Sequence, residues 1–512
     1  MRLWRQKLFI SIISVVVILM FSALFAEAEA NMETLKVRAR GGYDIETLDP
    51  AFLMGNEEHN INLAIFSRLV EFDHKNPEEL KLDAAKEFEV REEGTEIYFE
   101  LKEGIEFHED YGEMTAEDVK FSFERFVDPE IDSPYREDFG PLQEVEIIDR
   151  YRGKIILSEP YPGLLERTLP LFSGAILSKE AFEDKGQDEF ATNPVGSGPY
   201  KFTDWQPGEK IVLSEFENYH GENPEFSQIE IYPIEEEEAA EIAFDTGELD
   251  ETRISLEARD RYKEEPDVSV HELNMLRFEW LGFNHMQSPF DDRRVRKAIR
   301  YAVNVDEVIR GAYDGAARRA NTLIPPEVTG HWEDAPEYEQ NLERARELLK
   351  EAGYEDGFST ELASYAVPVH LTASQIIQHN LAQIGIDVQI NTLEGGEFYE
   401  VVSDTSYPGM HFMGYSMVPD PGYWTEWYSA EQIGSWNYLQ WDHEEFNELH
   451  QQASVTVDDD KREEKYIRMQ EIMDEEVAFV PISYDAALQV ARNPIDPAYL
   501  FHYTLYKEFD VK

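Results

Sequence analysis

Hydrophobic positions in the first half of the chain, after residue 30, recur mainly with a period of two, which predicts β-strands. The apolar members of two such strands are Leu35, Val37 and Ala39, and then Ile97, Phe99 and Leu101. Further strands are predicted at residues 154–158 and 210–214, with a turn rich in glycine and proline at 194–200 between them. This part of the chain is therefore expected to be rich in β-structure.

A helix interrupts these strands at Thr115. Thr115 and Asp118 have the spacing of a residue pair that caps a helix, and Val119, Phe123 and Phe126 then share one face. This spacing predicts an amphipathic helix.

From residue 291 the period changes to that of helices alternating with strands. The helical stripes are Val295, Ala298, Ile299, Ala302 and Val303, then Leu342, Ala345, Leu348, Leu349 and Ala352. Asn341 and Gly353 have the residue types of a helix start and stop. A third helix, at about 372–383, leads through Gly385 into a strand at 386–390, and a final helix holds Tyr466 to Met473. This order predicts an α/β layer with a largely parallel sheet.

The first thirty residues differ from the rest of the chain. Three basic residues among the first seven precede the apolar run 8–25, and residues 26–30 offer two overlapping A-x-A frames. This pattern predicts a secretory signal peptide over residues 1–30, cleaved after Ala28 or Ala30. A retained transmembrane anchor is the alternative, because the run is about long enough to span a bilayer.

The chain contains no cysteine. An exported protein of this composition has no disulfide framework, no thiolate metal site and no thiol nucleophile. It also lacks the lipidated cysteine that tethers many exported bacterial proteins. Export without a lipid anchor favours a periplasm, where a second membrane retains the protein.

The net charge of -60 arises from 106 Asp and Glu against 46 Lys and Arg. Such a chain is a poor partner for nucleic acid or an anionic membrane surface. The excess is spread along the whole chain, which favours adaptation to high salt over a site for cationic ligands.

Catalytic motifs do not emerge from the sequence. The Gly196-Ser197-Gly198 segment has the wrong spacing for a nucleophile elbow. The His271-Glu272 and His443-Glu444 pairs lack the second histidine that a zinc-protease motif requires. We therefore predict no catalytic residue, no metal ligand and no cofactor. A secreted hydrolase stays the alternative from another class of protein, because paired carboxylates could serve a glycosidase.

One stretch, Leu101 to Phe126, resembles the signature region of the bacterial extracellular solute-binding proteins of family 5. It combines Phe107-His108 with Thr115-Ala116-Glu117-Asp118-Val119, where the family has F-H-x-G and T-A-x-D-V. Further matching segments, in order, are 47–50, 68–71, 194–200, 247–250, 282–284, 292–299, "ARELLKEAGY" and "NLAQIGIDVQI". The family comprises the receptors of peptide, oligosaccharide and nickel ABC importers.

The resemblance implies a two-lobed periplasmic-binding-protein fold, large and of type II, with an extra subdomain inserted in lobe I. It places lobe I at residues 31–284 with the inserted subdomain at about 80–190, lobe II at 285–484, and a return to lobe I at 485–512. It also implies that the two lobes close on a ligand by a hinge motion, and that an importer recognises the closed form. No covalent step is needed, so the chain is expected not to be an enzyme.

The resemblance also implies a set of ligand-binding residues between the lobes. The loop after the first strand and the aromatic segment before Asp-Pro in lobe II are the main contributors. The expected residues are Met54, Gly55, Asn56, Glu57, Phe398, Tyr415, Ser416, Met417, Val418, Asp420, Trp424, Trp427, Trp436, Tyr438, Tyr484 and Asp485. For each single aromatic residue, packing within a lobe is the alternative.

The chain departs from the family at Val418. Peptide receptors that clamp a free amino terminus place an Asp three or four residues after the glycine equivalent to Gly414. A buried ammonium without a partner costs several kcal/mol, so Asp420, Asp485 or Glu57 replaces that Asp, or the ligand has no free terminus. Nickel is disfavoured because no histidine lies in this segment.

We therefore expect a monomeric receptor of an ABC importer, with peptides first and oligosaccharides second as ligands, and the importer permease as its partner. A sensory or chaperone-like ectodomain held by an uncleaved leader is a third possibility.

Overall fold

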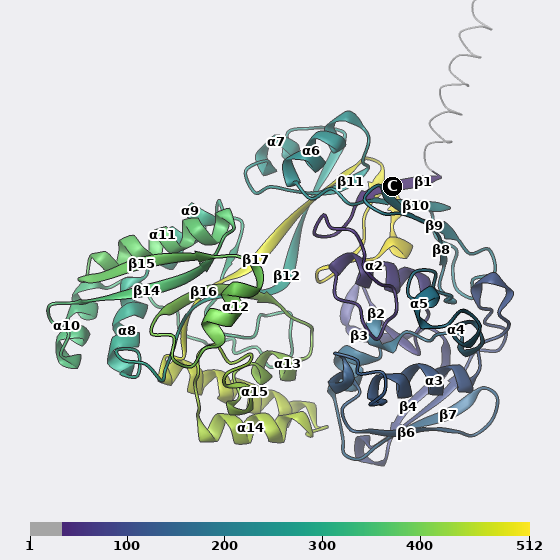
Figure 1. The fold of residues 1–512 in the computed structure, drawn as a ribbon, viewed down its shortest axis with the longest axis horizontal. Coiled ribbons are helices and arrows are strands. Elements are labelled where there is room, and N and C mark those ends of the chain that lie inside the picture. The colour runs from purple at the N-terminus through teal and green to yellow at the C-terminus, as the bar shows by residue number, and fades with distance from the viewer. Residues whose placement is uncertain (1–32) are drawn as a thin grey trace, which may run out of the picture.

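The computed structural model describes residues 33–512, apart from the side chains of Glu78, Asn274, Asp485 and Ala486, and it forms two lobes (Figure 1). The predicted signal peptide lies outside the described residues. Lobe I is the half coloured purple to blue, together with the C-terminal end of the chain, and lobe II is the green half. No helix within residues 33–512 combines the length and hydropathy needed to cross a membrane.

One sheet of eleven strands extends through both lobes. In sheet order it contains β15 (Ile386–Leu393), β14 (Phe358–Tyr365), β16 (Met410–Ser416), β12 (Val268–Phe283), β17 (Phe479–Arg492), β11 (Glu251–Ile254), β1 (Thr34–Arg38), β10 (Gln228–Tyr232), β9 (Lys210–Glu215) and β8 (Tyr200–Gln206), with β13 (Arg318–Arg319) paired to β17. Strands β15, β14 and β16 lie in lobe II, and the five strands from β11 to β8 in this order lie in lobe I.

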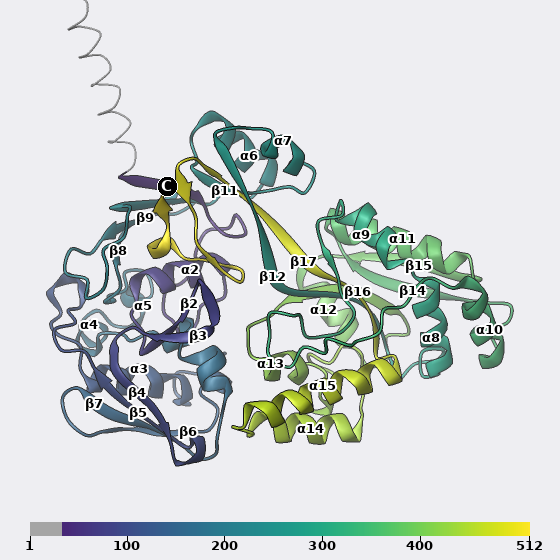
Figure 2. The same cartoon turned by 180° about the vertical axis from the view of Figure 1, so that it is seen from behind.

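The long antiparallel strands β12 and β17 connect the two lobes (Figures 1 and 2). Their register shifts between Asn274 and Phe278, in the middle of β12. A register shift marks a bulge, where a strand bends and twists more strongly. The strands therefore pass from one lobe to the other near this bulge. The expected ranges of the lobes and of the inserted subdomain stay predictions.

Lobe I also holds a separate antiparallel sheet in the order β4-β5-β7-β6. Its strands are β4 (Ala85–Arg91), β5 (Glu96–Leu101), β7 (Arg152–Leu157) and β6 (Leu142–Ile147), and α3 (Ala116–Val127) packs on β6. The predicted helix start is confirmed, because the backbone N–H of Thr115 donates to Asp118 Oδ2 at 2.8 Å. Val119, Phe123 and Phe126 are buried, as their spacing predicts.

The other elements of lobe I surround these two sheets. They are α2 (Asn56–Ile65), β2 (Val70–Asp73), β3 (Asn76–Leu82), α4 (Lys179–Lys185), α5 (Gln187–Phe190), β18 (Ile495–Asp496), β19 (Tyr499–Leu500), β20 (Tyr503–Thr504) and β21 (Asp510–Val511). Helices α6 (Glu237–Thr246) and α7 (Arg259–Lys263) lie beside β11, at the top of Figure 1.

Lobe II is the predicted α/β layer, in which β14 pairs in parallel with both β15 and β16. Its helices are α8 (Arg293–Ala302), α9 (Val305–Ala312), α10 (Leu342–Ala352), α11 (Pro368–Ala382), α12 (Gly395–Ser403), α13 (Pro421–Glu426), α14 (Glu444–Ser454) and α15 (Asp459–Glu476). The caps predicted for α10, Asn341 and Gly353, are confirmed. Helix α11 begins before the predicted residue 372, because Pro368 fits the first turn of a helix.

The apolar residues of the two lobes form separate cores. One core joins β1, the β4–β7 sheet and α3 of lobe I, and two others lie on the two sides of the lobe II sheet. Separate cores are expected for lobes that keep their own packing when they move relative to each other.

Candidate ligand cleft

Two adjoining cavities lie between the lobes, and residues of both lobes line each of them. The cavity nearer Met54 has a volume of about 420 Å³, and the cavity nearer Arg462 has a volume of about 490 Å³. They share Glu137, Arg167, Tyr423 and Glu426, so together they form one cleft. We call them the aromatic cavity and the charged cavity. Ligand pockets commonly enclose about 300–1,000 Å³.

The lobe I wall of the aromatic cavity is formed by Met54, Tyr135 and Phe172. Met54 is 73% exposed. The loop that carries it is fixed by Glu58, whose Oε2 accepts hydrogen bonds from the backbone N–H groups of Met54 (2.8 Å) and Gly55 (2.7 Å). The same carboxylate caps α2. An apolar side chain is thus held in the cleft by a rigid loop.

The lobe II wall of the aromatic cavity is formed by Val418, Trp427 and Trp436. The rings of Trp427 and Trp436 are 4.9 Å apart between centroids, and Tyr415 lies 4.3 Å from Trp427. Val418 also packs against the core of lobe I. The aromatic cavity is thus closed on one side by a cluster of large aromatic rings.

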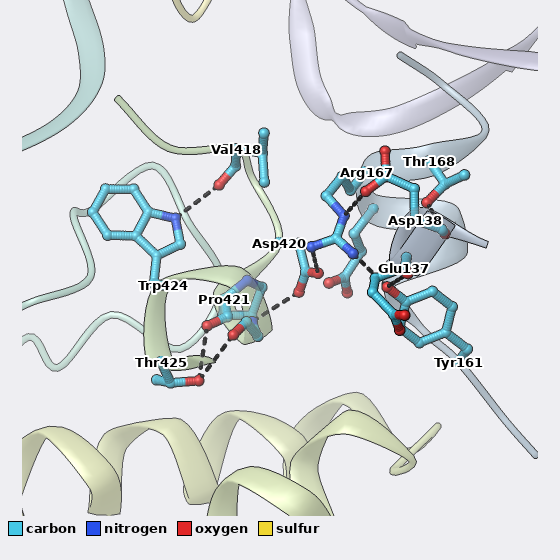
Figure 3. A network of polar contacts seen from close by, with 12 residues as sticks. Glu137, Asp138, Tyr161, Arg167, Thr168, Val418, Asp420, Pro421, Trp424 and Thr425 are labelled. Carbon is cyan, nitrogen blue, oxygen red and sulfur yellow. Dashed lines mark hydrogen bonds and ion pairs between the residues drawn. The ribbon is translucent and has the colours of Figure 1, made fainter. Parts of the chain in front are cut away.

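Local structure places the lobe II wall. After β16 ends, Asp420 caps α13 by accepting from the backbone N–H of Gly422 at 2.8 Å, and Pro421 occupies the first helical position. The indole N–H of Trp424 donates to the Val418 carbonyl at 2.7 Å (Figure 3). These bonds fix the segment 417–421, which turns Val418 and Asp420 toward lobe I.

Charged side chains of both lobes meet at the junction of the two cavities (Figure 3). Arg167 of lobe I lies 3.4 Å from Asp138 and 3.5 Å from Asp420 of lobe II. Arg462, on α15, lies 3.2 Å from Asp420 and also contacts Glu166 of lobe I. Asp420 therefore links a guanidinium of each lobe, and these contacts hold the lobes together.

Burial dominates the electrostatics of this junction. It raises the pKa of Glu166 to about 7, against the attraction of Arg462. Burial also raises the pKa of Asp138 and Glu426, in both cases against the attraction of Arg167. For Arg167, burial alone would lower the pKa, but Tyr161, Asp138 and Asp420 hold it above its ordinary value. The guanidinium is therefore charged while the carboxyls beside it are costly to ionise.

The structure brings five of the sequence-predicted residues to the cleft. Met54, Val418, Trp427 and Trp436 line the aromatic cavity, and Asp420 lines the charged cavity. Gly55 lies beside Met54 at the start of α2, and Asn56, the first residue of that helix, is exposed. Ser416 is exposed at the end of β16, and Tyr415 is half-buried behind Trp427.

Other predicted residues lie in the interior instead of at the cleft surface. Phe398 and Trp424 are completely buried in the core of lobe II, and Tyr484 is 2% exposed with its hydroxyl donating to the Thr322 carbonyl at 2.9 Å. Met417 and Tyr438 are buried in the same core. These five residues support the cleft wall and do not line it. Glu57 is likewise buried, beneath the cleft loop. The side chain of Asp485 is not described.

Sequence reasoning missed most lobe I residues of the aromatic cavity and two residues of α13. The missed residues are Tyr135, Glu137, Asp138, Arg167, Phe172, Tyr423 and Glu426. Those of lobe I come from short irregular segments, which carry no periodic pattern. Glu426 stands between the two predicted residues Trp424 and Trp427. A charged residue within an aromatic stretch was the one signal in the sequence that could have indicated this cleft residue.

A serine, a histidine and an aspartate also meet outside the cleft, in lobe I. His220 Nε2 lies 3.1 Å from Ser67 Oγ and 3.4 Å from Asp83 Oδ1. A catalytic triad needs the aspartate on the other ring nitrogen, and Ser67 is buried. This grouping therefore does not have the geometry of a hydrolase site. Residues 33–512 contain no cluster of His, Asp or Glu arranged to hold a metal ion.

Comparisons with known proteins identify the same kind of protein throughout. The model of "Bacterial extracellular solute-binding proteins, family 5 Middle" matches residues 79–436, more than half of the chain. The chain is 28% identical over 479 residues to the dipeptide-binding protein of Escherichia coli K12, covering 87% of this chain and 88% of that protein. It is 26% identical to di/tripeptide-binding protein 1 of Pseudomonas aeruginosa, with the same two coverages.

A solved structure is similar over nearly its whole length. It is the ABC transporter-associated periplasmic binding protein DppA from Helicobacter pylori in complex with the peptide STSA. The TM-score is 0.78 at 27% identity, over 93% of this chain and 97% of that one. The predicted two-lobed α/β fold of the periplasmic binding proteins is confirmed.

Proposed function

Because the chain belongs to the bacterial extracellular solute-binding proteins of family 5, we propose that it is the receptor of an ABC importer, which captures a peptide between its lobes and delivers it unaltered to a membrane permease. The observation that carries this proposal is the cleft, which both lobes line and beside which β12 and β17 connect the lobes. The dipeptide-binding and di/tripeptide-binding relatives support peptide as the ligand.

Closure of the lobes follows from this geometry. A ligand in the cleft touches both walls only when the lobes are together, so its binding energy favours the closed form. The bulge in β12, between Asn274 and Phe278, is placed to absorb the bending. The contacts that join the two lobes, Arg167 with Asp420 and Arg462 with Glu166, would be lost when the lobes separate. A permease that reads this form would receive only loaded receptor.

An exported, unanchored receptor fits the sequence of the first thirty residues. We propose that cleavage after Ala28 or Ala30 releases the chain into the periplasm, as a monomer. Sequencing the amino terminus of the protein purified from its native cells tests this, and Met1 on the purified protein would favour the retained ectodomain instead.

A binding screen tests the receptor function. Purified chain lacking residues 1–30 is titrated by calorimetry with di- to hexapeptides and with oligosaccharides, and the ligand is afterwards recovered and identified by mass spectrometry. We expect saturable binding of one peptide per chain and recovery of the peptide intact. Binding of oligosaccharides alone would support the alternative ligand, for which the exposed face of Trp436 is suited. Cleavage of any ligand would support a hydrolase.

A further inference from the structure

The cleft offers no acidic partner at Val418, which lines the aromatic cavity with an apolar side chain. Two of the three residues expected to substitute for an acid there are already occupied. Asp420 receives a hydrogen bond from Gly422 and contacts Arg167 and Arg462. Glu57 accepts from the Arg40 backbone N–H at 2.6 Å and from Tyr506 at 2.7 Å, away from the cleft. Neither carboxylate is available to a ligand in this arrangement.

Glu426 is differently placed. It is the last residue of α13, it is half-buried, and it lines both cavities of the cleft. Among the residues that the structure describes, its carboxylate has no hydrogen bond or ion pair. The cation that acts on it most strongly is Arg167, which is engaged by Asp138 and Asp420. A half-buried carboxylate without a partner is costly, and an incoming cation would remove that cost.

The charges around Glu426 favour the same kind of ligand group. Glu137, Asp138 and Glu426 line the aromatic cavity, and Arg167 is the single basic residue among the lining residues. The carboxylates therefore exceed the cations at the point where the two cavities join. A cationic group would be attracted there and an anionic group repelled.

The aromatic rings of the cavity provide a second attraction that does not depend on these carboxylates. Trp427 packs edge to face with Tyr423 at 5.7 Å between ring centroids, and the Trp436 ring lies 4.9 Å from that of Trp427. The ring faces of tryptophan and tyrosine attract cations, and organic cations are bound in this way in aromatic cages. The rings and the carboxylates therefore both favour a cationic group of the ligand.

We propose that this part of the cleft binds an organic cation of the ligand, an ammonium or a guanidinium, with Glu426 as its counter-ion and Trp427 and Trp436 as its aromatic wall. The proposal rests on the proposed peptide-receptor function and adds the ligand class to it. The cation has two possible sources in a peptide, the free amino terminus and a lysine or arginine side chain. Val418 then contacts an apolar part of the ligand, since the cation lies toward Glu426.

Matched peptides test the proposal on the unmodified chain lacking residues 1–30. The probes are Leu-Ala-Ala, its N-acetylated form, and N-acetyl-Leu-Lys-Ala, titrated by calorimetry at one salt concentration. We expect at least tenfold weaker binding of the N-acetylated peptide without lysine than of one or both cationic peptides. Tighter binding of Leu-Ala-Ala identifies the amino terminus as the source, and tighter binding of the lysine peptide identifies the side chain.

A variant assigns the effect to Glu426. Glu426→Gln keeps the shape of the side chain and removes its charge, so it is expected to weaken binding of the peptides that carry a cation at least tenfold and not to weaken binding of the N-acetylated peptide without lysine. Glu209→Gln, in the exposed β8–β9 turn, removes the same charge far from the cleft and is the control. Equal weakening of peptides with and without a cation by Glu426→Gln, or no weakening, would contradict the role of Glu426.

The outcomes separate the two proposals. Equal affinity of all three peptides for the unmodified chain would overturn the cation proposal and leave the peptide receptor standing. If none of the three peptides binds and none of the wider peptide screen binds, the receptor function fails and the cation proposal fails with it. The comparison of the three peptides on the unmodified chain tests the cation proposal even if Glu426→Gln does not fold.

Discussion

At the scale of single residues, burial determines which side chains line the cleft, and the residue type alone does not reveal this burial. Trp424 lies on α13 and Trp427, three positions later, directly follows the helix, yet Trp424 lies inside lobe II and Trp427 lines the aromatic cavity. Both are aromatic residues in the same predicted segment, so their residue types could not distinguish a wall residue from a core residue. The sequence did show that Val418 stands where peptide receptors have an aspartate, because valine and aspartate differ in charge.

Two buried carboxyls of lobe I make stability depend on pH. Burial raises the pKa of Glu57 and of Glu251 to about 7 each, although hydrogen bonds from Arg40 and Tyr506 to Glu57, and from Tyr499 to Glu251, act in the other direction. Such a carboxyl binds its proton more tightly in the folded chain than in the unfolded chain. Its contribution to stability is therefore complete below about pH 4.5 and is lost as the pH rises to about 7.

We expect Glu57→Gln to reduce this loss. Each carboxyl accounts for about 3 kcal/mol of the fall in the free energy of unfolding between the two pH values, and a glutamine does not titrate. Urea unfolding at pH 5 and at pH 7.5 measures the fall in the unmodified chain, in Glu57→Gln and in the exposed control Glu209→Gln. A fall of the same size in all three proteins would show that Glu57 does not titrate in this range.

At the scale of elements, the cleft is assembled from segments that the sequence keeps far apart. The helical turn at Leu164–Thr168 of lobe I approaches the start of α13 in lobe II, where Asp420 is found. Gly163 precedes this turn, and a methyl group on its Cα would lie 2.9 Å from Asp420 Oδ2 and 3.0 Å from the Tyr161 ring. The backbone of Gly163 is helical, so the close contacts with Asp420 of lobe II and with the Tyr161 ring, and not the backbone conformation, require a glycine.

Gly163→Ala should therefore weaken ligand binding more than it destabilises lobe I. The added methyl group separates Asp420 from Arg167, and the closed form loses contacts that the open form does not have. We expect affinity for the best peptide of the screen to fall about tenfold, with a melting temperature of the ligand-free chain within about 2 °C of the original. Gly396→Ala, on α12 with open space around its Cα, is the control. Unchanged affinity in Gly163→Ala would mean that this contact plays no part in closure.

The regular elements could be predicted from the sequence, whereas the cleft could be predicted only in part. Helix α10 was delimited by its caps and α3 by Thr115 with Asp118, because caps and periodic burial are local. Resemblance to the family supplied Met54 and Trp427. Arg167 and Tyr135 lie in irregular segments of lobe I and meet lobe II only through the fold, so no local pattern indicates them.

At the scale of the whole molecule, the charge of -60 is the dominant property. Carboxylates at this density repel one another, and the repulsion favours the unfolded chain, in which they are farther apart. The described part of the chain pairs a minority of them with lysine or arginine, for example Glu100 with Lys86 and Glu355 with Lys350 at the surface. The remaining repulsion is screened as the salt concentration rises, because the screening length falls from about 10 Å at 0.1 M to about 3 Å at 1 M.

We expect the melting temperature to rise steeply between 0.1 M and molar concentrations of sodium chloride. Differential scanning calorimetry over this range measures the effect. Repeating the series with a relative of smaller net charge separates screening from general effects of salt. A melting temperature that stays constant across the range would contradict adaptation to high salt.

Small-angle X-ray scattering of the chain lacking residues 1–30, with and without a saturating peptide found by the binding screen, tests most directly that two lobes joined by β12 and β17 close on a solute. The account predicts that peptide reduces the radius of gyration of the unmodified chain. At the same peptide concentration, the radius of gyration of Gly163→Ala should be larger than that of the unmodified chain. Superimposable profiles of the free and the saturated chain would contradict closure.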